Sequence, residues 1–187
     1  MSQQYKLVTS NENKITEFNR LAGDLSFSIE KGQDLKEVKS NDAIEVAIYK
    51  AIDAGVGCIV EDTILTIDGE EVTDIRYRLD ELRMRQAEAR LSWITTLAVC
   101  HEDRVEMHRG VINGRFSPLD IIPDDAFGFD PFFIPDGETK SLYVLEKEGI
   151  KDQFSARKLA IDSIRYGNSF HSILLSGVSK WEGEYQE

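Results

Sequence analysis

Short apolar runs alternate with amphipathic helical patterns in the N-terminal third of the chain, and this alternation constrains the fold more than any other feature. An apolar run at residues 5–8 is followed by a helical pattern that begins after Asn11, a suitable N-cap. Alternating apolar side chains at residues 25–29 indicate a half-buried strand. A second amphipathic helix at 41–55 leads into the apolar run 58–60. This β-α-β-α-β order predicts an α/β fold with at least part of its sheet parallel.

The middle of the chain predicts antiparallel structure. Residues 66–72 indicate a strand that ends in a turn, and residues 76–89 a polar helix. The runs 93–100 and 104–112 are two strands separated by three turn-like residues, which is typical of a hairpin. The sequence NGRF at 113–116 predicts a further turn.

The remainder of the chain predicts a long loop and one clear helix. All four prolines fall within residues 117–138, so this window is expected to be mostly irregular. A helical pattern follows at about 153–167, and residues 169–175 are a candidate last strand. With no linker or repeat, residues 1–187 are expected to form a single domain.

The net charge of −12 excludes a broad nucleic-acid surface, because binding a phosphate backbone requires a basic field. It allows one small polyanion in a local pocket that also holds a metal ion. No apolar stretch reaches the length of a membrane span, and the N-terminus lacks a signal-peptide core. We therefore expect a cytoplasmic protein with no membrane partner.

Cys58 and Cys100 are the only cysteines, and each lies in an apolar run. No histidines accompany them at the spacing of metal ligands, so neither a zinc site nor a disulfide framework is indicated. Two reduced structural thiols are expected.

The first candidate site is the junction VTSNENK at residues 8–14, where a strand enters a helix through small polar residues. Free backbone amides and the helix dipole favour an anion at such a junction, and Lys14 adds a positive charge. The glycine pattern of a Walker loop is missing. An N-capped helix is also a common structural feature without any ligand, and both interpretations stay open.

The second candidate site is the acidic pair Glu61 and Asp62, inside the apolar sequence GCIVEDTILT. A parallel strand that ends at Val60 would present both carboxylates at the edge of the sheet where α/β proteins bind ligands. Mg²⁺ prefers such oxygen ligands together with substrate phosphates, and Glu37 is a third carboxylate that could reach the same edge. The alternative is an exposed acidic turn.

The third candidate site is the sequence AFGFDPFFIPDG, in which four phenylalanines crowd a glycine- and proline-containing loop. Aromatic rings on a stiff loop can stack on a nucleobase, and Asp130 could accept a hydrogen bond from a base N–H. The more common role of such a cluster is to close one end of a hydrophobic core. Lys151 and Arg157, which follow, are basic residues whose default location is a solvated face.

These segments, in this order, resemble the Ham1 family of inosine triphosphate pyrophosphatases. The resemblance runs from VTSNENKITEF through DLKEV, IVEDT and HRGVINGRF to GFDPFFIPDG and KDQFSARKLA. It implies an elongated mixed β-sheet flanked by helices, with two lobes and a central cleft. It also implies a homodimer and a Mg²⁺-dependent enzyme that cleaves non-canonical purine nucleoside triphosphates such as ITP, dITP and XTP into monophosphate and pyrophosphate.

The resemblance also implies roles for individual residues. Glu37 and Asp62 would bind the metal, and Asp62 or Glu61 would help to activate water. The residues implied in substrate binding are Thr9, Ser10, Asn11, Lys14, Lys50, Thr63, Phe127, Gly128, Phe129, Asp130, Lys151 and Arg157.

Two segments depart from the family pattern. The family's Ser-His-Arg appears here as Ser155, Ala156 and Arg157, and GEEVTDIRYR replaces the usual glycine- and proline-rich turn after the acidic motif. Because Ala156 replaces a histidine at the base end of the pocket, the same chemistry on a different modified nucleotide stays an alternative. The second departure concerns the surface that commonly contributes to the dimer. A nucleotide-binding protein without turnover is the alternative from another functional class.

Overall fold

The computed structural model describes residues 4–23, 26–31, 35–72, 81–82, 84, 88–126 and 128–186, with only the backbone described at 26–31. Most of the polar helix predicted at 76–89, and most of the segment that replaces the family's turn, lie outside these residues. Phe127 lies outside them as well.

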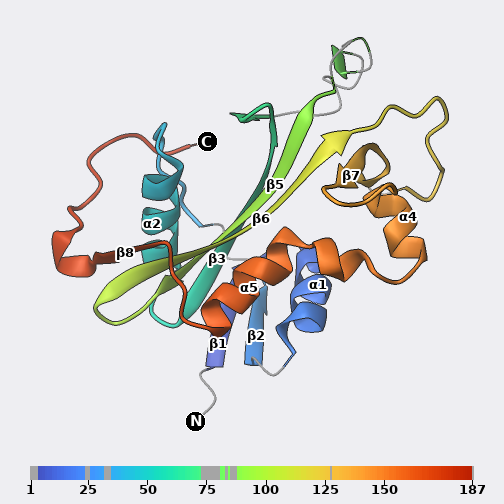
Figure 1. The fold of residues 1–187 in the computed structure, drawn as a ribbon. Coiled ribbons are helices and arrows are strands. Elements are labelled where there is room, and N and C mark those ends of the chain that lie inside the picture. The colour runs from blue at the N-terminus through green and yellow to red at the C-terminus, as the bar shows by residue number, and fades with distance from the viewer. Residues whose placement is uncertain are drawn as a thin grey trace. The chain divides into compact units, whose positions relative to one another are not determined.

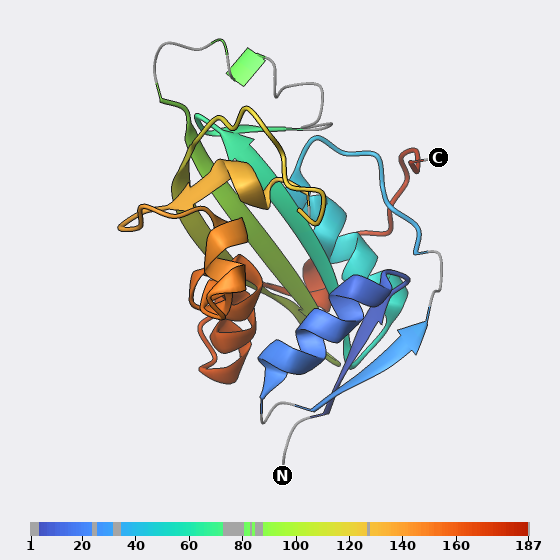
Figure 2. The ribbon, with the colours of Figure 1, turned by 90° about the vertical axis from the view of Figure 1, so that its right-hand side faces the viewer.

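The described strands join in one mixed sheet in the order β2-β1-β3-β5-β6-β7, with β4 beside β3 and β8 beside β6 (Figures 1 and 2). β1 pairs in parallel with both β2 and β3, as the β-α-β-α-β order predicts. β7 and β8 pair antiparallel with β6. The expected mixed α/β sheet flanked by helices is confirmed.

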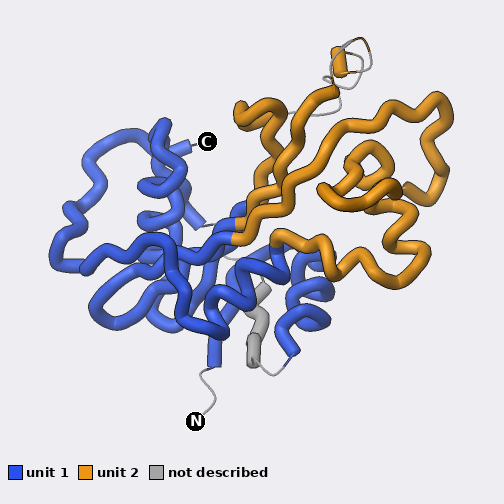
Figure 3. The backbone as a smooth tube through the Cα atoms, viewed as in Figure 1, with its two compact units in different colours: residues 1–62, 96–109, 157–187 blue, residues 63–95, 110–156 orange. Residues whose placement is uncertain are grey.

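The chain forms two compact units, coloured separately in Figure 3. Unit 1 comprises residues 1–62, 96–109 and 157–187, and unit 2 comprises residues 63–95 and 110–156. Three strands contribute residues to both units: β3 (Cys58–Ile67), β5 (Arg90–Cys100) and β6 (Arg104–Phe116). The expectation of a single domain over residues 1–187 stays a prediction.

Unit 1 places helices against both faces of its part of the sheet. Its further elements are β1 (Gln4–Thr9), α1 (Glu12–Ala22), β2 (Ser26–Lys31), α2 (Ala43–Ala54), α5 (Ala156–Arg165, in this unit from Arg157), β8 (His171–Leu174) and η3 (Leu175–Gly177). Ile59 packs in a core cluster with side chains of α1 and α5, whereas Val60 packs with side chains of α2. Successive side chains of β3 thus point to opposite faces, as strand geometry requires.

Unit 2 is built around phenylalanine rings. Its further elements are β4 (Glu70–Glu71), η1 (Asp130–Phe132), β7 (Phe133–Pro135), α4 (Leu142–Lys147) and η2 (Lys151–Phe154). Phe116, Phe129 and Phe132 contact one another with ring centroids 5.6–6.1 Å apart. Leu142 and Leu145 of α4 belong to the same buried cluster.

Several sequence predictions are confirmed. Asn11 caps α1, β5 and β6 are joined by the expected short turn, and β8 is the predicted last strand. Both cysteines are buried free thiols. Among the described residues, no helix has the length and apolar character needed to cross a membrane.

Two predictions need correction. β3 does not end at Val60 but continues through the acidic pair to Ile67, because the β-branched and apolar residues beyond the pair are themselves buried. β6 likewise runs through the predicted NGRF turn to Phe116. The prediction that residues 117–138 are mostly irregular is confirmed, with η1 and β7 as short elements within the window. The short helix α4 was not predicted.

The glycine of NGRF has a packing role in place of a turn role. Gly114 pairs with Pro135 across β6 and β7, and a Cβ added there would lie 2.6 Å from the Phe133 ring and against the carbonyl oxygen of Ile134. Only glycine allows the two strands to approach this closely.

We expect Gly114→Ala to lower the free energy of unfolding by about 3 kcal/mol, because the added methyl group must displace a buried ring and a backbone carbonyl. Urea denaturation measures the change. Gly177→Ala is the matched control, since a Cβ at Gly177 meets no atom within 4 Å. Equal losses in the two variants would contradict the close-packing role.

Candidate active site

The start of α1 is ordered by its own side chains. The Asn11 side-chain oxygen accepts hydrogen bonds from the backbone amides of Asn13 and Lys14 at 3.0 and 3.3 Å. The Asn11 amide donates to the Thr9 hydroxyl at 3.2 Å, and Ser10 beside it is exposed. These three amides already have partners, so they are not free to bind an anion, and Lys14 contributes a positive charge in the first turn of the helix.

Glu61 is the most constrained charged residue of unit 1. Its side chain is only 2% exposed, yet each carboxylate oxygen faces a cation. Oε2 lies 2.6 Å from Nζ of Lys14, and Oε1 accepts a hydrogen bond from Arg157 at 3.0 Å. The buried charge therefore has the partners that burial demands.

Arg157 reaches Glu61 from the first turn of α5. Its guanidinium also pairs with Glu17 and lies over the Phe18 ring, 5.4 Å from the centroid. Glu17 was not singled out in the sequence, although it follows Lys14 by three positions and so shares its face of the helix. That spacing in the sequence could have identified Glu17 as a neighbour of Lys14. The Arg157 side chain is 13% exposed and forms ion pairs, so it does not lie on the solvated basic face that is the default location for such a residue. Its contact with substrate stays a prediction.

Asp62 has a different environment from its neighbour. Because side chains alternate along a strand, Glu61 is directed to the face covered by α1 and α5, and Asp62 to the face covered by α2. Asp62 is exposed at its surface. On the same side, Lys50 of α2 lies 2.7 Å from Glu37 through its Nζ and the Oε1 of the glutamate.

The pKa of the Asp62 carboxyl is raised above its ordinary value. Loss of water around the carboxylate is the largest cause, and the negative charge of Glu61 comes next, with a smaller contribution from Glu37. Lys50 and Lys14 oppose the shift. Although part of the residue reaches solvent, its carboxylate stands among other carboxylates, and a further positive charge would relieve that repulsion.

This electrostatic setting fits a hard divalent cation. Glu37 and Asp62 offer oxygen ligands on one side of unit 1, whereas both oxygens of Glu61 are engaged by cations. The described residues contain no ready-made group of three or more metal ligands. Mg²⁺ needs no such cage, because it commonly takes one or two carboxylates and completes its shell with water and substrate phosphates.

The remaining candidate residues lie in unit 2. Thr63 shares a hydrogen bond with Thr95, their hydroxyl oxygens 2.8 Å apart. Asp130 is buried and pairs with Lys151, whose ammonium also lies 3.5 Å from Glu146. Gly128 is exposed, with φ of 56°.

The rings of the aromatic loop that the structure describes are core residues. Phe129, Phe132 and Phe133 are each at most 4% exposed. The interpretation of the loop as a plug for the core is therefore confirmed for these rings. Contact of this loop with a base stays a prediction. The loop residues that reach solvent, and not the buried rings, would make that contact.

Comparison with known proteins shows which family the chain belongs to. A sequence model of the Ham1 family matches residues 5–166. The chain belongs to the Ham1 family. It is 28% identical to the dITP/XTP pyrophosphatase of Hyperthermus butylicus over 171 residues, which covers 81% of this chain and 87% of the relative. It is 30% identical to the dITP/XTP pyrophosphatase of Elusimicrobium minutum over 161 residues, 75% and 78% of the two chains.

Solved Ham1 structures share the fold. The Ham1 protein of Staphylococcus aureus superposes with a TM-score of 0.64 at 21% identity, covering 87% of this chain and 97% of the other. The HAM1 protein of Coxiella burnetii gives a TM-score of 0.66 at 20% identity, covering 88% and 97%. The mixed sheet expected from the sequence is therefore that of Ham1 proteins.

We expect Glu61→Gln to lower the free energy of unfolding by about 2 kcal/mol, because it leaves two cations facing a neutral amide in a buried site. Glu17→Gln is the matched control: its side chain is 33% exposed, so the loss should be about 1 kcal/mol or less. Denaturant unfolding of both variants measures the difference. A larger loss for Glu17→Gln would show that Glu61 is not the principal partner of Arg157.

Proposed function

We propose that this chain is a nucleoside triphosphate pyrophosphohydrolase that uses Mg²⁺ to cleave non-canonical purine nucleotides such as ITP, dITP and XTP. The enzyme class, a hydrolase acting on acid anhydrides, follows from membership of the Ham1 family and from two pyrophosphatase relatives. The observation that supports the finer parts of the proposal is the difference between the adjacent carboxylates of Glu61 and Asp62. Glu61 holds two cations, while Asp62 is exposed with a raised pKa.

In the proposed reaction, a water oxygen bonds to the α-phosphorus, and the bond from that phosphorus to the oxygen bridging to the β-phosphorus breaks. Pyrophosphate leaves, and the nucleoside monophosphate remains. Asp62, which is exposed beside the proposed metal, accepts a proton from the attacking water. Because Glu61 has both oxygens in ion pairs, the structure supports Asp62 over Glu61 as the base.

Charge neutralisation is the main requirement of phosphoryl transfer. Lys14 and Lys50 supply it from unit 1, and each ammonium has three N–H donors, so a single carboxylate partner leaves donors for phosphate oxygens. Arg157, whose side chain is 13% exposed, adds to the local positive charge. Bound Mg²⁺, held by Glu37 and Asp62, would supply Lewis-acid polarisation of the phosphate.

Base recognition is proposed for the loop of unit 2. The buried Asp130 and the partly exposed Lys151 form a pair of hydrogen-bonding groups there. A site built to pair with a 6-oxo purine rejects a base that leaves its groups unsatisfied. Ala156, where the family has histidine, is 6% exposed. We further propose that the protein is a homodimer and that it acts on nucleotides in the cytoplasm.

Incubation with ITP, XTP, dITP and the standard triphosphates in the presence of Mg²⁺, followed by an assay for pyrophosphate, tests the proposal directly. We expect the non-canonical purines to be cleaved fastest. Asp62→Asn should lower turnover by about 10³-fold while nucleotide binding survives, because the loss of a positioned base removes that much catalysis. Absence of pyrophosphate from every triphosphate would refute the enzymatic proposal, and unchanged turnover in the variant would remove Asp62 from the mechanism.

We expect Ala156→His to shift the ranking of substrates toward inosine-type bases by about tenfold in relative kcat/KM, since one added hydrogen bond to a base is worth about 1–2 kcal/mol. The measurement is kcat/KM for ITP and XTP in the two proteins. Ala160→Ser, a small change at a buried position further along α5, controls for general disturbance of the helix. An unaltered ranking would show that position 156 does not select the base.

A further inference from the structure

Residues 36–39 form a short extended segment whose importance lies in Glu37, a proposed metal ligand. The segment is attached to α2 on one side: the Lys36 amide donates to Asp53 Oδ2 at 2.9 Å. Val38 is 1% exposed. The segment belongs to none of the long strands, so its backbone groups need other partners.

Those partners come from the far end of the chain. The Gln186 amide donates to the Glu37 carbonyl at 2.8 Å, and the Lys39 amide donates to the Glu184 carbonyl at 2.9 Å. Together they form an isolated antiparallel bridge between Val38 and Tyr185. The Gln186 side-chain amide adds a bond to the Val38 carbonyl at 3.1 Å. We call residues 184–186 the C-terminal clamp.

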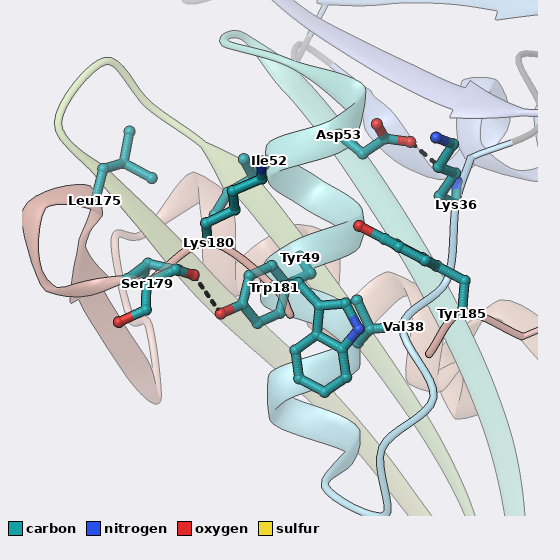
Figure 4. A pocket seen from close by; sticks show the side chains of 11 residues that line it. Lys36, Val38, Tyr49, Ile52, Asp53, Leu175, Ser179, Lys180, Trp181 and Tyr185 are labelled. Atoms are coloured by element: carbon teal, nitrogen blue, oxygen red, sulfur yellow. Dashed lines mark hydrogen bonds between the residues drawn. The ribbon is translucent and has the colours of Figure 1, made fainter. Parts of the chain in front are cut away.

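The chain that leads to the clamp packs against α2. Tyr49 donates its hydroxyl hydrogen to the Ser179 carbonyl at 2.5 Å, and its ring meets the Trp181 ring at a centroid distance of 5.3 Å (Figure 4). The Trp181 ring nitrogen donates to the Glu184 carbonyl at 2.9 Å.

A cavity of about 470 Å³ lies among these groups, bounded by α2, residues 36–38 and the C-terminal chain. Beside this cavity, the clamp and residues 36–39 are joined by the three hydrogen bonds described above.

The Glu37 side chain is held from α2 as well, through its ion pair with Lys50. Its carboxylate position thus depends on two fixed points, the Lys50 ammonium and the clamped backbone. If the backbone bond were lost, the half-exposed glutamate could follow Lys50 away from Asp62. Partners of this kind strongly affect metal affinity although they never touch the metal.

We propose that Gln186 is a positioning residue for the metal site, which it serves by fixing the backbone of Glu37. The inference rests on the proposed role of Glu37 as a metal ligand and deepens it. It adds a residue outside the 5–166 region that matches the family model.

Gln186→Pro tests the proposal, because proline has no N–H to donate to Glu37. Tyr185 is extended in its bridge, a conformation that a following proline favours, so the chain path is preserved. Gln186→Ala is the matched control, since it loses only the side-chain bond and keeps the backbone bond. Mn²⁺ binding, measured by electron paramagnetic resonance with and without a non-hydrolysable ITP analogue, reports the site independently of turnover.

We expect Gln186→Pro to weaken Mn²⁺ binding by about tenfold and Gln186→Ala by about twofold, with melting temperatures changed by about 2 °C or less. In a Glu37→Gln background the proline should have little further effect, because coupled residues are not additive. Unchanged Mn²⁺ affinity in Gln186→Pro would overturn the inference. So would an equal loss with and without Glu37. Absence of turnover in the unmodified protein is a separate result that refutes the proposed function and not the clamp.

Discussion

The pairing of Glu61 with Lys14 and Arg157 is the interaction on which the site depends. An ionised carboxylate with a side chain 2% exposed is tolerated only if both oxygens meet positive charge. Three separated parts of the chain, α1, β3 and α5, supply these groups. Once they are joined, the two cations and the adjacent Asp62 have defined positions, so one ion-pair cluster both stabilises unit 1 and positions the groups proposed for catalysis.

The alternation of side chains along β3 places the two adjacent carboxylates on opposite faces of the sheet, in different surroundings. Glu61 faces the helices that neutralise it, and Asp62 faces α2, where Lys50 and Glu37 lie. A helix could not separate consecutive residues so completely, because the directions of consecutive side chains differ by about 100° in a helix and by about 180° in a strand. The strand therefore allows one carboxylate to be structural while the next stays accessible to a metal and to water.

The sequence predicted the elements whose patterns are local. The helix after Asn11, the helix of α2 and the hairpin of β5 and β6 each follow from periodicity and capping. The continuations of β3 and β6 were missed because charges and an Asn-Gly pair resemble strand ends. Their true cause is tertiary: Glu61 has distant cations, and Gly114 allows close packing of β7. The clamp has no local signal, since its partners are 148 positions apart in the case of Val38 and Gln186.

That separation has a consequence for synthesis. On a ribosome adding roughly 5–20 residues per second, residues 36–39 emerge roughly 7–30 s before residues 184–186 exist. For that interval the Glu37 backbone has no clamp, whatever the progress of folding elsewhere. Under the proposed role of the clamp, a chain still being translated would bind the metal at Glu37 less tightly than the finished protein does.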